Sequence, residues 1–129
     1  MADFFEEQAA LYKALSHPVR LAILEILREG EECVCHMEAA LGLRQAYISQ
    51  QLMVLRDIGL VENRRDGWNS FYYVLKPEIF AVLDAACRMY GKSPTARAAA
   101  SQLITSPADC NCPKCAAGTA VSELNLEEK

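Results

Sequence analysis

Six cysteines are the most informative residues of this 129-residue sequence, because they gather in clusters. They are Cys33 and Cys35, then Cys87, then Cys110, Cys112 and Cys115. The amino terminus has neither the basic start nor the apolar block of a signal peptide, and no apolar run is long enough for a membrane helix. We therefore expect a cytoplasmic chain, in which clustered cysteines favour metal binding or redox chemistry over a disulfide framework.

The spacing of Cys33 and Cys35 limits how they can bind one ion. On a regular helix they would face directions about 200° apart, so the chain must be extended there or just entering a helix. A helix amino terminus lowers the pKa of a thiol and favours the thiolate, which is the metal ligand.

Arsenic(III) and antimony(III) prefer three sulfur ligands, and Cd(II), Pb(II) or Zn(II) take three or four. We predict a site for As(III) or Sb(III), with those three ions as alternatives, completed by Cys110, Cys112 and Cys115.

Other roles remain open for these residues. The three tail cysteines can instead form a separate zinc clip or a reversible redox switch, and a site completed by the tail can lie within one protomer or between two. Cys33 and Cys35 can also act as an oxidant-sensing thiol pair. We expect His36 to cap a helix or face solvent rather than bind metal, and Cys87 to be buried on an apolar helix face.

Charge is unevenly distributed along the chain. The net charge of −4 by itself disfavours nucleic acid as a partner. Residues 44–76, however, carry five basic and three acidic side chains, whereas the segments on both sides are net acidic. Contact with double-stranded DNA is expected in this middle segment. No phosphate loop, carboxylate pair, catalytic triad or thioredoxin-like motif is visible, so we do not expect an enzyme.

The helical pattern predicts a helix-turn-helix. Residues 4–15 form a first helix, and Ser16 caps a second helix that Gly30 ends. A short helix closed by Gly42 is followed by a four-residue turn and a longer amphipathic helix ended by Gly59. A short helix, a tight glycine-containing turn and a longer helix make up the DNA-binding motif.

The longer helix separates into two faces. Ile48, Leu52 and Leu55 have the spacing of core residues. The side chains left to face outward include hydrogen-bonding groups suited to base edges, with arginines placed for the DNA backbone. The predicted DNA contacts of this helix are Gln45, Tyr47, Ser49 and Gln50, flanked by Arg44 and Arg56.

The period then changes to that of strands. Two short strand-like runs flank Asp66-Gly67, a strong hairpin signal. A basic hairpin directly after a helix-turn-helix is a wing, and we predict that Arg64 and Arg65 reach the minor groove or its phosphates. Residues 77–91 form one more amphipathic helix.

These elements predict the fold class and the domains. The fold is mainly α with a small β-hairpin wing (α+β), a winged helix-turn-helix. Residues 1–92 form a DNA-binding and dimerisation domain, and residues 93–129 form a carboxy-terminal extension that carries the cysteine-rich segment.

Three stretches of residues 9–90 resemble the ArsR/SmtB family of metal-responsive repressors. They are ALSHPVRLAILEIL, ECVCHMEAALGL and QAYISQQLMVLRDIGLVENRRDGWNSFYYVL. The resemblance implies a homodimer that binds operator DNA and releases it when metal binds at the CVC, with dimer contacts from the first helix and residues 77–91. Two recognition helices would then read half-sites about one helical turn apart.

The sequence departs from the family pattern at two positions. His36 stands where the family often has Asp. On the late helix Asp84 is present without the histidines that a second metal site there would use, and this favours an all-sulfur site.

Overall fold

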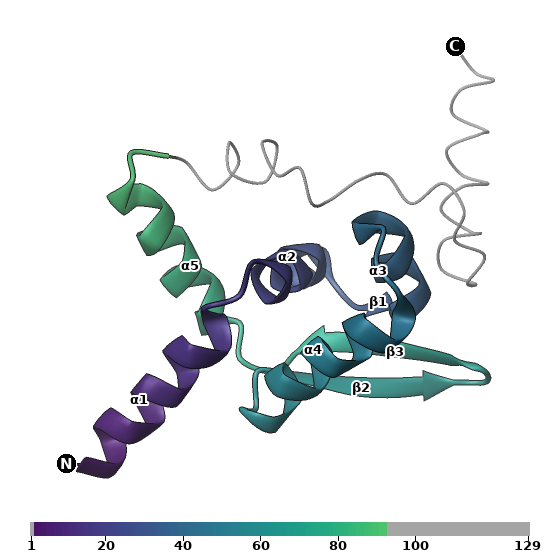
Figure 1. The fold of residues 1–129 in the computed structure, drawn as a ribbon, viewed down its shortest axis with the longest axis horizontal. Helices are drawn as coiled ribbons and strands as arrows, with labels where there is room; N and C mark the ends of the chain where they lie inside the picture. The colour runs from purple at the N-terminus through teal and green to yellow at the C-terminus, as the bar shows by residue number, and fades with distance from the viewer. Residues whose placement is uncertain (1, 93–129) are drawn as a thin grey trace.

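The computed structural model describes residues 2–92 as five helices and a small sheet. In chain order the elements are α1 (Ala2–Leu15), α2 (Pro18–Ile26), the 3-10 helix η1 (Leu27–Glu29), β1 (Glu32–Cys33), α3 (Val34–Leu41), α4 (Gln45–Asp57), β2 (Val61–Asp66), β3 (Asn69–Val74) and α5 (Glu78–Met89). Figure 1 shows α1 and α5 at one end of the molecule, with the β2–β3 hairpin extending at the other. The predicted winged helix-turn-helix is confirmed.

The start of α2 differs from the sequence prediction. His17, not Ser16, caps the helix: its Nδ1 accepts a hydrogen bond from the Val19 backbone N–H at 3.2 Å. Pro18 occupies the first turn as expected, since its missing N–H needs no partner there. The Ser16 hydroxyl instead donates to the Lys13 carbonyl at 2.9 Å and closes the last turn of α1.

Two other helix boundaries also differ. The second helix tightens to 3-10 geometry at η1 before Gly30, whose φ is +146°. The short helix α3 begins at Val34, earlier than its apolar pattern indicated, because Cys33 caps it. Its end is as predicted: Gly42 takes the left-handed conformation with φ +66°, which favours glycine.

The sheet has one strand more than the sequence indicated. Its order is β1-β3-β2, with both pairings antiparallel. β1 contributes only two pairs, Glu32 with Tyr72 and Cys33 with Phe71. A strand this short has too few residues to show alternation in the sequence, and the wing provides its pairing partner.

The hairpin turn is shifted by one residue from the prediction. Asp66 pairs with Asn69, so the two turn residues are Gly67 and Trp68. Gly67 has φ +61° and no non-glycine residue in the described chain has positive φ, which is the pattern of a type II′ turn.

The core lies where α2, α3 and α4 meet the sheet. Ile48, Leu52 and Leu55 are fully buried, as the spacing predicted. Other fully buried side chains of this core are Ile23, Leu24, Met37 and Val61. From α5, Ile79 and Leu83 join the same cluster.

None of the helices described in residues 2–92 is long and apolar enough to cross a bilayer.

Candidate DNA interface and thiol site

The exposed face of α4 carries the predicted DNA-reading residues. Gln45, Tyr47 and Gln50 are exposed, and Ser49 is half-buried. Arg44, at the cap position of α4, and Arg56, in its last turn, are also exposed. The structure therefore leaves polar and cationic side chains on the face of α4 opposite its core contacts.

Two contacts that the sequence did not indicate hold α4 against α2. Arg20 Nε donates to Gln51 Oε1 at 2.8 Å, and Gln51 is only 8% exposed. The same arginine donates through Nη1 to the Ala14 carbonyl at the end of α1, at 3.1 Å. The Tyr47 hydroxyl lies 3.3 Å from His17 Nε2. The orientation of α4 is thus fixed by polar contacts as well as by its core face.

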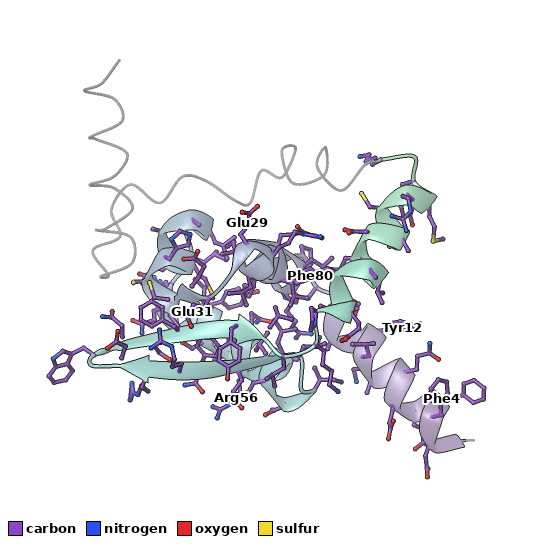
Figure 2. All side chains as sticks on the ribbon, turned by 180° about the vertical axis from the view of Figure 1, so that it is seen from behind. Phe4, Tyr12, Glu29, Glu31, Arg56 and Phe80 are labelled. Atoms are coloured by element: carbon purple, nitrogen blue, oxygen red, sulfur yellow. The ribbon has the colours of Figure 1, made fainter. Side chains whose placement is uncertain are left out.

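Of the two wing arginines, Arg64 is engaged within the protein. Its Nη2 and Nε donate to the two carboxylate oxygens of Glu31 at 2.6 and 3.2 Å. This hydrogen bonding raises the pKa of Arg64. The guanidinium also lies 5.0 Å from the centre of the Phe71 ring. Arg65, the next residue, is exposed. Figure 2 shows Glu31 beside the hairpin, so the segment before β1 reaches the wing directly.

Arg56 is tied to the wing as well. Its Nε lies 2.8 Å from Glu62 Oε1, an ion pair between the end of α4 and β2. The side chains of Arg56 and Glu62 are 50% and 36% exposed, so solvent screens the pair and it adds little stability. Its geometric effect is to place the α4 arginine beside the first wing strand.

Cys33 and Phe71 form a small buried cluster apart from the main core, and Cys35 and Ala39 pack against this cluster. Cys33 is 1% exposed, and its Sγ accepts a hydrogen bond from the His36 backbone N–H at 3.1 Å. Cys35 is half-buried in the first turn of α3. Cys33 is thus on extended chain and Cys35 just inside the helix, which is the backbone geometry that the spacing requires of a pair sharing one ion.

His36 and Cys87 have different surroundings from the pair. His36 does not cap the helix, because Cys33 is the cap, and it is partly buried rather than exposed: its Nδ1 lies 3.4 Å from Glu32 Oε2 and its side chain is 20% exposed. Cys87 is buried at 6% exposure, as predicted.

The predicted tail ligands Cys110, Cys112 and Cys115 lie outside the described residues. Within residues 2–92 the structure has no group of three or more His, Cys, Asp or Glu side chains able to hold a metal ion.

An ion-pair network that the sequence did not reveal joins η1 to α5. Arg28 donates to both carboxylate oxygens of Asp84, at 2.8 and 3.2 Å, and to both of Glu25, at 2.9 Å each. Hydrogen bonding to Glu25, and then to Asp84, raises the pKa of Arg28. Its guanidinium also lies 4.6 Å from the centre of the Phe80 ring. The network anchors α5 on the body of the domain.

Replacing Asp84 with Asn is expected to lower the free energy of unfolding by about 1 kcal/mol, because it removes a charge-assisted pair that is partly screened from water. The side chains of Arg28 and Asp84 are 27% and 23% exposed, so the effect stays well below that of a buried pair. Urea unfolding of D84N, R28M and the double variant measures the coupling. A coupling energy near zero would show that the network does not anchor α5.

Comparison with known proteins agrees with this arrangement. The family model described as "Bacterial regulatory protein, arsR family" matches residues 17–63. The chain is 43% identical over 79 residues to the biofilm growth-associated repressor of Xylella fastidiosa, covering 61% of this chain and 69% of that protein. It is 36% identical over 89 residues to the HTH-type transcriptional regulator Rv0081 of Mycobacterium tuberculosis, covering 68% of this chain and 78% of that protein.

Solved structures of similar regulators have the same fold as this chain. The crystal structure of Rv0081 superposes with a TM-score of 0.63 over 68% of this chain and 89% of that one, at 36% identity. A homodimeric winged helix-turn-helix domain of Mycobacterium bovis, described as a possible ArsR-family regulator, matches with a TM-score of 0.63 and 30% identity over 69% of this chain and 85% of that one. Reduced HlyU from Vibrio cholerae matches with a TM-score of 0.63 and 32% identity over 70% of this chain and 95% of that one.

These relatives are named as regulators and repressors, which confirms the expectation that the chain is not an enzyme. The family match covers α2 to the first half of β2, the segment that contains Cys33, Cys35 and the whole of α4. The chain belongs to the ArsR family of bacterial regulatory proteins.

Proposed function

We propose that this chain is a DNA-binding transcriptional repressor that releases its operator when a thiophilic ion binds Cys33 and Cys35. One observation carries the proposal: Cys33 is both the cap of α3 and the β1 residue that pairs with Phe71 of the wing. A ligand on its sulfur therefore acts at the first helix of the helix-turn-helix and at the wing together.

The DNA-reading part of the proposal rests on α4. Gln45, Tyr47, Ser49 and Gln50 read base edges in the major groove, where a recognition helix inserts its amino-terminal half. Arg44, Arg56, Arg64 and Arg65 bind phosphates or the minor groove. The burial pattern supports these roles, because the apolar face of α4 is used in the core and the polar face is left for a partner.

The sensing part rests on the chemistry of two adjacent thiols. Soft thiolates select As(III), Sb(III), Cd(II), Pb(II) or Zn(II) over hard cations, and three sulfurs suit As(III) and Sb(III) best. We assign the further ligands to Cys110, Cys112 and Cys115. The N–H that already donates to Cys33 Sγ supports the site, because it stabilises a thiolate there.

Few residues separate the proposed ion site from the wing that contacts DNA. An ion bound to Cys33 Sγ acts on a residue that also accepts the His36 N–H and pairs with Phe71. Arg64 lies over that same ring and is held by Glu31, two residues before Cys33. We infer that ion binding alters the wing through β1, and that the ion weakens DNA binding only by its difference in affinity for the two states.

We also propose that the repressor is a homodimer, as the M. bovis relative is named. Exposed aromatic and apolar side chains on α1 and at the end of α5 support this: Phe4, Phe5, Tyr12, Met89 and Tyr90. Figure 2 shows Phe4 and Tyr12 on α1, at the opposite end from the wing, which leaves α4 and the hairpin open to DNA.

The deciding experiment begins with selection of a duplex from a random-sequence DNA pool by the full chain. Binding of the selected duplex is then titrated with arsenite, antimonite, cadmium, lead and zinc. Enrichment of a sequence, followed by its release by at least one ion, is the expected result. No enrichment would overturn the repressor role, and enrichment without release by any ion would overturn metal sensing. A chain cut before Asp109 that still responds fully would remove the tail from the site.

Replacing Glu31 with Gln is expected to tighten binding of the selected duplex severalfold, because Arg64 is then released toward phosphate and a negative charge leaves the DNA-facing side. Glu29→Gln is the matched control: it removes the same charge from an exposed residue that Figure 2 shows away from the hairpin. Fluorescence anisotropy with labelled duplex measures both. Equal affinity changes in E31Q and E29Q would mean that the Glu31–Arg64 pair has no specific effect.

A second candidate is a repressor that senses oxidants through the same thiols. The shared cluster of Cys33 and Cys35 supports it, as does the Vibrio cholerae relative solved in a form named reduced. Hydrogen peroxide would accept two electrons and two protons from the thiols, giving one S–S bond and two waters. Mass spectrometry after mild peroxide distinguishes the candidates: a reversible loss of two hydrogens, with loss of DNA binding, favours redox sensing.

A further inference from the structure

The tip of the wing carries an exposed tryptophan that neither the fold nor the thiol site uses. Trp68 is 99% exposed, the highest value among the exposed large hydrophobic residues in the described part of the chain. It is also the single tryptophan of the sequence. An indole left in water is unfavourable, and at this exposure its whole face is available to a partner.

The turn fixes where this indole lies. Gly67, with φ +61°, makes the first residue of the two-residue turn, so Trp68 follows at the far end of a hairpin that is paired over its full length. The hairpin ladder runs without a break from Val61–Val74 to Asp66–Asn69. Trp68 is therefore held at the end of a paired ribbon, and Figure 1 shows that this end points away from α1 and α5.

Charge around the tip indicates the kind of partner. Arg64 and Arg65 precede the turn on β2, within the only net-positive segment of an otherwise acidic chain. The hairpin also continues directly from α4, whose Arg56 is ion-paired to Glu62 of β2. Glu62 and Asp66 leave the hairpin itself without net charge. Its exposed Arg65 beside the aromatic tip, next to a helix flanked by Arg44 and Arg56, nevertheless complements a polyanion that has stacked rings.

We propose that Trp68 is an apolar wedge that enters the minor groove of duplex DNA beside the major groove read by α4. This inference rests on the repressor role proposed above. Wedges of this kind insert partway between base pairs and kink the duplex, and pyrimidine–purine steps such as TA and CA open most easily. Selected duplexes are therefore expected to carry such a step at the position that the wing reaches.

The test uses the full chain and a duplex selected by it from a random pool. Because Trp68 is the only tryptophan, its emission reports on the tip alone, and saturating duplex is expected to quench and shift it. Trp68→Ala is expected to weaken binding about 10-fold, as loss of one stacking contact does, while Trp68→Phe keeps most of the affinity. Thermal unfolding of W68A should match that of the unmodified chain, because the Trp68 side chain is almost fully exposed on the described domain.

Salt dependence separates a wedge from a phosphate contact. The slope of log K against log salt is expected to stay unchanged in W68A, whereas Arg65→Ala, the control, lowers its magnitude by about 1. If the duplex binds but Trp68 emission and W68A affinity are unchanged, the wedge is overturned and the repressor role stands. An emission shift that follows protein concentration without DNA would assign the tip to a second copy and also overturn it. If no duplex is selected, both proposals fail.

Discussion

Replacing Cys33 and Cys35 together with Ser is expected to leave DNA binding intact and to abolish release by arsenite. Serine is a strong helix cap, so its hydroxyl can accept the His36 N–H that Cys33 Sγ accepts now, and the start of α3 is retained. A hydroxyl does not replace a thiolate for a soft ion, so the site is lost. In the unmodified chain we expect about 100-fold weaker duplex binding with arsenite, a coupling of ~2.7 kcal/mol, and in the double variant less than a twofold change.

Anisotropy titrations of a selected duplex, with and without arsenite, measure this coupling. Cys87→Ser is the control, because this cysteine is buried on α5 and takes no part in the proposed site. It should retain full release. A double variant that still releases DNA would place the sensing site outside Cys33 and Cys35, and a C87S variant that loses release would extend the site to α5.

Leu52→Ala is expected to cause the largest loss of stability, about 2–5 kcal/mol, because it empties a fully buried position of α4. Losses of this size are a large fraction of the stability of a small domain. The change acts on the face of α4 that packs against α2 and α3, so the DNA-reading face remains chemically unchanged. Urea unfolding monitored by circular dichroism gives the change in midpoint at constant slope.

Met53→Ala provides the matched control for Leu52→Ala. Met53 is the next residue of the same helix and is 62% exposed, so its truncation should change the free energy of unfolding by no more than about 0.5 kcal/mol. Similar losses in the two variants would contradict the assigned orientation of α4.

The fold was largely accessible from the sequence because its main signals are local. Ile48, Leu52 and Leu55 recur at helical spacing, and every one is buried. Gly42 ends α3 in the left-handed conformation that glycine favours. No local pattern predicts β1, because two residues show no period and its pairing to β3 depends on a strand formed almost 40 residues later.

The site was accessible only in part, for the same reason. The spacing of Cys33 and Cys35 predicts an extended chain entering a helix, and the structure has this backbone geometry, while the shared ion site stays a proposal. The contacts of Glu31 with Arg64 and of Arg28 with Asp84 join residues 33 and 56 positions apart. Such pairs depend on how the elements pack, and no local pattern in either segment reveals them. The exposure of Trp68 is not predictable from the Asp-Gly pair, because it depends on a turn placed one residue later.

For the ion sensing proposed above, the shortness of β1 would also set how fast the ion can bind. Cys33 Sγ is almost fully buried, so an incoming ion has no direct route to it. Only two residues pair β1 with β3, and an element this small opens by local fluctuation at a free energy far below that of global unfolding. The ion then binds at the diffusional rate multiplied by the fraction of molecules in which β1 is detached from β3. The amides of Glu32 and Cys33 should accordingly exchange with deuterium sooner than those of the β2–β3 ladder, and their exchange rates should bound the rate of induction.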